Sequence, residues 1–191
     1  MPLIHGFDPP ERFVTGTVGP PGQRTFFLQA RSGARITSVS LEKQQVAALS
    51  ERMDQLLDEV MASDTAESVI PAVAPLGLDD TEPLEQPIEE EFRAGTMTLS
   101  WDPADARVVI EVFPFTEAAV VSPEQVEEDF EEPEPDELLL VRIPAGAARA
   151  FVKRATQVLS AGRPSCPFCG NPVDAEGHLC VRMNGFRRRE P

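Results

Sequence analysis

The spacing of apolar residues changes along this 191-residue chain in a way that restricts the folds open to it. Between residues 12 and 41 apolar and polar side chains alternate, as in strands, and turn residues such as Gly19-Pro20-Pro21-Gly22 interrupt them. Between residues 42 and 61 the apolar side chains recur every three to four positions, as on one face of a helix. Residues 92–160 repeat this order of strands followed by a helix.

The patterns predict three strands and one helix in each half of the chain. Strands are expected at residues 13–18, 24–30, 35–41, 92–101, 107–115 and 138–143. One helix of about twenty residues is expected from Glu42. A second begins at Pro144, where proline is tolerated, and ends before Gly162. Residues 1–11, with three prolines, are expected to form an extended lead-in.

The fold class that follows is α+β, with two βββα units at residues 12–61 and 92–160 inside a domain of residues 1–162. Counted from Leu41 and from Ile143, apolar residues follow at offsets five, eight, twelve and fifteen in both halves. The helical period alone can produce this agreement, so an internal repeat and a coincidence both stay open. A repeat predicts two layered units with pseudo-twofold symmetry, or one combined sheet carrying two helices on one face.

Two acidic tracts interrupt these elements. Residues 62–91 are rich in Ser, Pro, Asp and Glu, and we expect a mobile acidic loop that buries little apolar surface. Residues 124–137 carry many carboxylates between prolines, which predicts a solvated loop or a docking surface for a basic partner. Neither tract has the alternating carboxylates and central glycine of a calcium loop.

The charge of the chain limits its partners. The formal net charge is −15, which disfavours binding to nucleic acid or to an anionic membrane surface. No run of eighteen apolar residues occurs, and the first residues lack the basic and apolar regions of a signal peptide. We therefore expect a cytoplasmic protein, in a compartment where its thiols stay reduced.

All three cysteines and one of the two histidines fall between residues 166 and 180. The spacing is C-x2-C, eight residues, then H-x-C, and three thiolates with one imidazole form a tetrahedral zinc ligand set. Metal ligands are therefore predicted at Cys166, Cys169, His178 and Cys180. Because four ligands close the site, we expect one structural Zn2+ per chain, in a small zinc knuckle within a tail of residues 163–191.

Other interpretations of these cysteines stay open. A thioredoxin-like redox pair would use Cys166 and Cys169, but it needs neither a third cysteine nor a nearby histidine. Three inert thiols are the remaining alternative. If His178 does not bind the metal, an open coordination position would remain, and a catalytic zinc would have to be considered.

Catalytic signatures are otherwise absent from the sequence, and no catalytic residue is predicted. The chain has no G-x-S-x-G, P-loop, dinucleotide-binding glycine pattern or H-E-x-x-H. A nucleophile would need a base, and His5 and His178 are the two histidines that the chain offers. His178 is assigned to the metal and His5 is expected at the surface, so an ordinary enzyme is not indicated.

The end of the chain is basic although the protein is acidic. Residues that could contact a partner are Arg182, Phe186, Arg187, Arg188 and Arg189. Beside a zinc knuckle they could contact single-stranded nucleic acid, with the aromatic ring stacked on a base and the arginines on phosphates. The alternative is that these arginines pair with the acidic loops of the same protein.

Three stretches carry a resemblance to a known family. They are Thr15 to Ala30 (TGTVGPPGQRTFFLQA), Leu41 to Leu49 (LEKQQVAAL), and the Cys/His motif from Cys166 with the trailing Asn184-Gly185. Together they resemble an uncharacterised family of conserved actinobacterial proteins, domain of unknown function 3090. The resemblance covers nearly the whole chain apart from the acidic loops, and it implies no assigned activity.

The sequence thus supports three hypotheses of function. The first is a non-catalytic interaction or regulatory protein whose zinc tail and acidic loops contact another protein. The second is a nucleic-acid-associated protein that acts through its zinc knuckle and arginine-rich end. The third is an enzyme with an open zinc site or a redox dithiol. The partner, the pathway and the oligomeric state are not specified by the sequence.

Overall fold

The computed structural model describes residues 2–63, 70–116, 136–162, 166–171, 173, 177–180 and 182. Within these residues it has a mixed α+β fold of seven strands, two α-helices and one short 3-10 helix. The strands are β1 (Leu3–Phe7), β2 (Arg12–Val18), β3 (Thr25–Ser32), β4 (Arg35–Leu41), β5 (Glu90–Asp102), β6 (Arg107–Pro114) and β7 (Glu137–Pro144). The helices are α1 (Lys43–Ala62), η1 (Leu76–Leu78) and α2 (Ala145–Ser160).

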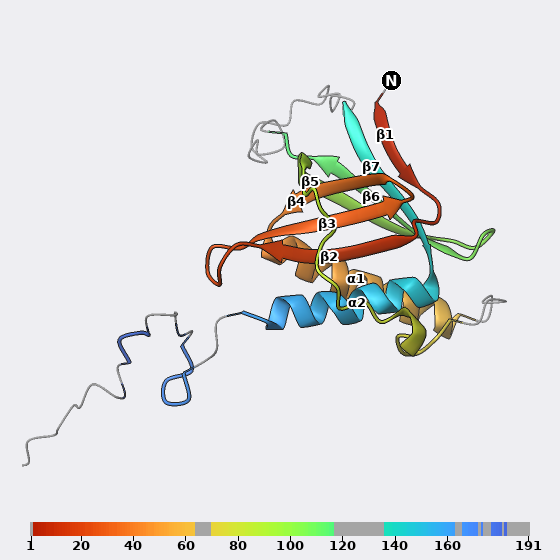
Figure 1. Cartoon of the computed structure of the whole chain (residues 1–191). Helices are drawn as coiled ribbons and strands as arrows, with labels where there is room; N and C mark the ends of the chain where they lie inside the picture. The colour runs from red at the N-terminus through yellow and green to blue at the C-terminus, as the bar shows by residue number, and fades with distance from the viewer. Residues whose placement is uncertain are drawn as a thin grey trace, which may run out of the picture.

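All seven strands belong to one sheet, in the order β1-β7-β6-β5-β4-β3-β2 (Figure 1). The pairs β1–β7 and β4–β5 are parallel, and the other pairs are antiparallel. The six predicted strands and both predicted helices are present. The two halves do not form separate layered units, because β4 of the first half pairs with β5 of the second.

Strand β1 was not predicted. Residues 3–7 were expected in an extended lead-in, but they pair in parallel with β7 from Leu3 opposite Glu137 to Phe7 opposite Val141. The prediction was wrong because the partner strand lies near the other end of the chain, and no local pattern reveals such a pairing. Pairing buries the Phe7 side chain in the main core and covers an edge of β7.

The sheet is strongly curled. Strands β1 and β2 lie at its two opposite edges, yet only residues 8–11 connect them. Four residues span less than about 20 Å even when fully extended. Figure 1 shows the consequence: strands β2–β4 cross in front of β5–β7. The Arg35 guanidinium at the start of β4 lies 4.1 Å from the centre of the Phe7 ring of β1, so the edge strand β1 also contacts an interior strand of the other half.

The two halves of the chain show the same pattern of strand pairing: a parallel pair with the other half, followed by an antiparallel pair within the half. In β5 Glu90 and Arg93 pair in parallel with β4, and the residues from Ala94 onward pair with β6. A register irregularity between Ala94 and Met97 interrupts the pairing with β6. In the first half β1 pairs in parallel with β7, and β2 pairs with β3. In each half, therefore, the first part of the chain pairs in parallel with the last strand of the other half: β1 with β7, and the start of β5 with β4.

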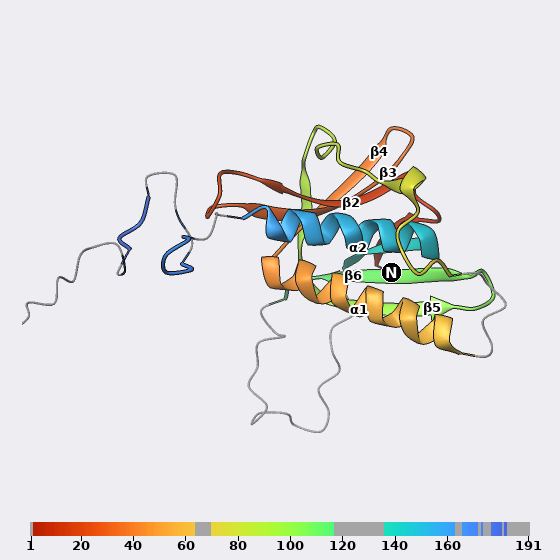
Figure 2. The same cartoon turned by 90° about the horizontal axis from the view of Figure 1, so that it is seen from below.

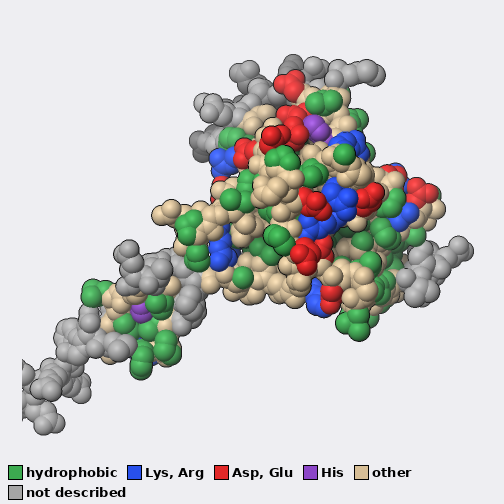
Figure 3. All heavy atoms as spheres, viewed as in Figure 1, with side chains coloured by type: hydrophobic (Ala, Val, Ile, Leu, Met, Phe, Trp, Pro, Cys, Tyr) green, Lys and Arg blue, Asp and Glu red, His purple; other side chains and the backbone are tan. Residues whose placement is uncertain are grey.

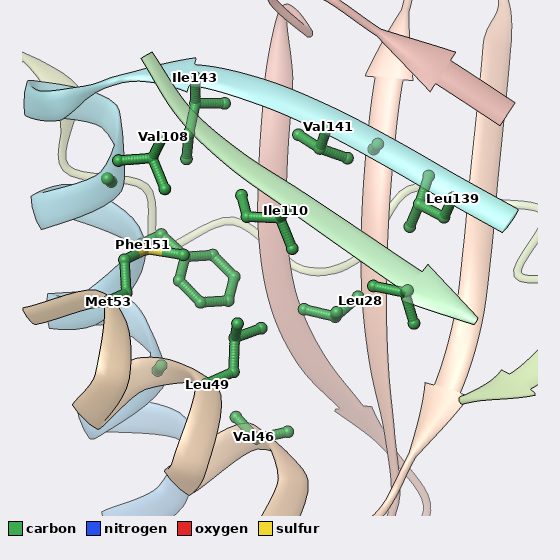
Figure 4. Packing of buried hydrophobic residues seen from close by; sticks show 14 of the residues in the cluster. Leu28, Val46, Leu49, Met53, Val108, Ile110, Leu139, Val141, Ile143 and Phe151 are labelled. Carbon is green, nitrogen blue, oxygen red and sulfur yellow. The ribbon is translucent and has the colours of Figure 1, made fainter. Parts of the chain in front are cut away.

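Helices α1 and α2 lie side by side against the curled sheet (Figure 2). Figure 4 shows Leu49 and Met53 of α1 and Phe151 of α2 facing the same core as Ile110 of β6. The Phe151 ring also stacks on Phe13 of β2, with ring centroids 4.8 Å apart. The apolar face of each helix is therefore part of the main core.

Residues 70–89, which we call the strap, differ from the prediction of a loop that buries little apolar surface. Ile70 is buried in the main core, and Leu84 is buried against Val14 and Phe27 on the other face of the sheet. Buried Gln29 of β3 donates to the Glu85 carbonyl at 3.0 Å and accepts from the Glu85 N–H at 2.7 Å. The strap therefore covers the outer face of β2 and β3.

The carboxylate of Asp80 explains how an acidic segment packs on the body. It accepts hydrogen bonds from Arg12 of β2 and from buried Arg154 of α2, at 2.6 and 2.7 Å. Arg154 also donates to the Thr15 and Glu82 carbonyls. From composition alone, the acidic side chains of this segment were expected to be solvated. In the structure, arginine side chains that are distant in sequence bind the Asp80 carboxylate. The second acidic tract, except for its last two residues, lies outside the described residues, and its prediction stays open.

Candidate metal centre

The structure brings together the four predicted metal ligands. The ligand atoms of Cys166, Cys169, His178 and Cys180 all lie within 4.8 Å of one another. Cys166 and Cys180 are buried, and the other two are half-buried. We call the described residues between Cys166 and Arg182 the knuckle; it follows the end of α2 and forms a small lobe beside the body (Figures 1 and 3).

Two local hydrogen bonds shape the first half of the knuckle. The Gly170 N–H donates to the Cys166 carbonyl, and the Cys166 N–H donates to the Asn171 carbonyl, both at 2.8 Å. Gly170 has a φ of +77°, a conformation that glycine adopts without a steric penalty. The tight turn therefore depends on glycine directly after the second cysteine.

Backbone N–H groups point at two of the sulfur atoms. Burial raises the pKa of the Cys166 thiol, but hydrogen bonds from the backbone of Cys169 and Phe168, together with the neighbouring thiols, lower it overall. At Cys169 the backbone of Asn171 lowers the pKa, and burial with the two other thiols raises it overall. Such N–H groups stabilise a thiolate, which is the form of cysteine that binds a metal.

The distances fit coordination better than disulfide formation. All three cysteines are free thiols, and the Sγ atoms of Cys166 and Cys180 lie 3.8 Å apart, whereas a disulfide requires about 2.05 Å. The Cys169 Sγ lies 3.1 Å from His178 Nε2. Three sulfurs and one imidazole nitrogen therefore lie close enough to hold one metal ion.

The surface of the knuckle carries a feature that the sequence analysis missed. Phe168 is 52% exposed and Leu179 is 80% exposed, although each lies next to a predicted ligand. Hydrophobic side chains are visible on the surface of this lobe in Figure 3. The sequence could have indicated this exposure, because a segment too short to form a core cannot bury the apolar residues between its ligands.

Of the predicted partner-binding residues, Arg182 is described. Its guanidinium donates to the Phe168 carbonyl at 3.1 Å, which connects the two ends of the knuckle. Phe186, Arg187, Arg188 and Arg189 lie outside the described residues. Their proposed contact with a partner therefore stays a prediction.

The second histidine lies on the body. His5 of β1 is half-buried, and its Nε2 lies 3.1 Å from a carboxylate oxygen of Glu137 on β7. This pair connects the unpredicted edge strand to its neighbour. His5 is therefore not the free surface residue that the sequence suggested.

A family model described as "Protein of unknown function (DUF3090)" matches residues 5–180, from β1 through the last predicted metal ligand. No curated protein and no solved structure matches the chain. Neither α-helix of the described chain combines the length and the apolar character that a membrane span requires.

Proposed function

The chain belongs to the family described as protein of unknown function (DUF3090), and we propose that it is a non-catalytic zinc-binding interaction protein. In this proposal the α+β body carries a closed Cys3His zinc site. The zinc organises the knuckle, and the knuckle presents apolar side chains to a protein partner.

The choice of zinc follows from the donor chemistry. Thiolates and imidazole are soft or borderline ligands, and Zn2+ accepts them in tetrahedral geometry without a redox change. With Zn–S bonds of about 2.3 Å, two sulfurs at tetrahedral corners lie about 3.8 Å apart. The distance between the Cys166 and Cys180 sulfurs, 3.8 Å, supports this geometry. A fourth protein ligand leaves no open position for water, so the proposed zinc is structural.

The exposure of Phe168 and Leu179 is the observation that carries the proposed interaction. Short segments built around zinc have no core of their own, and their folding energy comes from metal binding. Such a segment therefore does not need large apolar side chains on its surface in order to fold. Exposed aromatic and aliphatic residues on a rigid support are typical centres of protein interfaces. The net charge of −15 also favours a protein over a polyanion as partner.

The experiment compares the wild type with the double variant Phe168→Ala/Leu179→Ala, each used to capture partners from the source cells. We expect the variant to keep its zinc and to lose the captured protein, which is then purified and rebound to both forms. Leu76→Ala is the matched control, because Leu76 is 86% exposed but lies in the strap. A partner that binds the double variant and the wild type equally would exclude the knuckle surface as the binding site.

Nucleic acid is the second candidate partner. The supporting observation is that Arg182 lies on the knuckle beside exposed Phe168, and an arginine with an aromatic ring is a common pair in single-strand binding. Binding of single-stranded RNA that weakens steeply with salt and is lost in Arg182→Ala would favour this function. Capture of the protein partner that survives nuclease treatment would favour the first.

A further inference from the structure

A cavity of about 270 Å³ lies on the body at the start of helix α1. Strand and turn residues from separate parts of the sequence line it together with the first turn of the helix. The lining residues used in the argument are Arg24, Ser40, Glu42, Lys43 and Arg93. No motif in the sequence indicates this site, because its basic residues are isolated from one another along the chain.

The cavity is basic although the protein is strongly acidic. Arg93 pairs with Glu42 at 2.6 Å, and Glu42 is the acidic residue of the lining. Arg24 donates to the Ala161 carbonyl at 2.6 Å, and Lys43 forms no ion pair with any described residue. Two positive charges thus lack a carboxylate within the described part of a chain that has 32 acidic residues. Arginine and lysine on such a chain would ordinarily pair with carboxylates, as Arg154 of α2 does with Asp80 of the strap.

Neutral hydrogen-bond donors face the same cavity. Ser40 of β4 is only 6% exposed and lines the cavity, yet its hydroxyl has no hydrogen-bond partner among the described residues. The Ser40 oxygen is not among the buried unpaired side-chain atoms of the described residues, so a ligand or water in the cavity can reach this hydroxyl. Lys43 is the first residue of the 20-residue helix α1, where the Glu42 side chain accepts from the Gln45 N–H in a capping box. The N–H groups of Lys43 and Gln44 stay without an acceptor within the helix. The helix dipole adds positive potential at this end.

We propose that this cavity binds a dianionic phosphate group, either free phosphate or the phosphate of a small monoester. Two uncompensated cations match the charge of a dianion, and a hydroxyl and a helix N-terminus supply further donors. Arg93 is held in place by Glu42 and by the Phe115 ring, 5.5 Å from its guanidinium carbon. The small volume and the negative charge of the body select a small ligand over a nucleic acid.

The test uses the full-length protein with zinc bound, at pH 8, where phosphate is mainly a dianion. Backbone amide shifts are followed by NMR during titration with inorganic phosphate and, separately, with ribose 5-phosphate. The variants are Lys43→Gln and Ser40→Ala, and Arg52→Gln is the control, because Arg52 is exposed on the same helix and bonds Gln55. Thermal unfolding of each variant verifies that it is folded.

We expect saturable shifts at the start of α1 and around Arg93. Affinity should fall about tenfold or more in Lys43→Gln and in Ser40→Ala and should not change in Arg52→Gln. Tighter binding of ribose 5-phosphate than of phosphate would identify a monoester as the ligand, and the reverse would identify free phosphate. Absence of saturable shifts, an equal loss in Arg52→Gln, or tighter binding of a single-stranded oligonucleotide at these residues would overturn the proposal.

Discussion

The sulfur atoms of Cys166 and Cys180 lie 3.8 Å apart although fourteen positions separate these residues in sequence, and no disulfide joins them. Ionised thiols at this distance repel each other, and the knuckle has no hydrophobic core to hold them together. A bound cation removes the repulsion and supplies folding energy. The proposed zinc therefore explains why the two ends of the knuckle meet.

Removal of the metal should affect the knuckle and leave the body folded. Within the described residues no hydrogen bond or ion pair joins the knuckle to the body, and the main core contains no knuckle residue. A zinc chelator should therefore abolish the protection of knuckle amides in hydrogen exchange and leave the thermal midpoint of the body unchanged. A large fall of that midpoint on chelation would show that the knuckle also supports the body.

Gly16 should not tolerate a side chain while Leu84 is present. A Cβ atom at Gly16 would lie 2.6 Å from Leu84 Cγ, where the strap packs on β2. Gly16→Ala should therefore lower the free energy of unfolding by about 1–3 kcal/mol through overpacking. Urea unfolding measures this change. In Gly6→Ala, where the nearest atom to the new Cβ is 3.9 Å away, the change should stay within about 0.5 kcal/mol.

A double variant at Gly16 and Leu84 tests whether overpacking against Leu84 causes this loss of stability. In a Leu84→Ala background the new methyl group at position 16 has space, so the added cost of Gly16→Ala should disappear. Equal costs of Gly16→Ala in both backgrounds would mean that the strap does not contact β2 at this point.

Arg154 should be one of the most sensitive charged residues. Its guanidinium is buried and satisfies the Asp80 carboxylate as well as the Thr15 and Glu82 carbonyls. Arg154→Ala removes the side-chain donor to the Thr15 carbonyl and leaves Arg12 as the other arginine bound to Asp80 and Glu82, so it should cost about 3 kcal/mol in the free energy of unfolding. Arg52→Ala, at an exposed site, should cost less than about 0.5 kcal/mol. Similar costs for the two variants would contradict the role of Arg154 in fixing the strap.

The strap should also contribute a dependence of stability on pH. The hydrogen bond from Arg12 is the largest of the contacts that hold the pKa of Asp80 below its ordinary value of 3.8. A lowered pKa in the folded state stabilises the protein above the pKa of the unfolded state, and this contribution is lost as the pH falls through the folded value. The free energy of unfolding should therefore fall below about pH 4, more steeply in the wild type than in Asp80→Asn. Identical slopes in urea titrations between pH 2 and pH 5 would contradict this assignment.

The parts of the fold that could be predicted from sequence are those with local signals. Strands β2–β7 and both helices follow from the alternation and helical spacing of their own residues. Strand β1 and the packed strap could not be predicted, because their partners lie far along the chain: β7 for the first, Arg154 and Gln29 for the second. The internal repeat stays a prediction, which the matching strand pairings of the two halves support.

The same distinction applies to the candidate sites. The four metal ligands lie within fifteen positions of the sequence, so their spacing was enough to predict that they form one site. The proposed phosphate cavity combines Arg24, Lys43 and Arg93, which are isolated in sequence. The pairings of β3 with β4 and of β4 with β5 bring them together at the start of α1. A site of this kind becomes visible when the fold is known.

The most direct test of the central claim is the metal content of the protein, purified under reducing conditions without added zinc. The wild type is compared with Cys166→Ser/Cys169→Ser, and both are analysed by mass spectrometry of the metal and by titration of free thiols. The zinc proposal predicts about one zinc per chain in the wild type and none in the variant. A metal-free wild type whose Cys166 and Cys169 form a reversible disulfide would contradict it and would favour a redox dithiol instead.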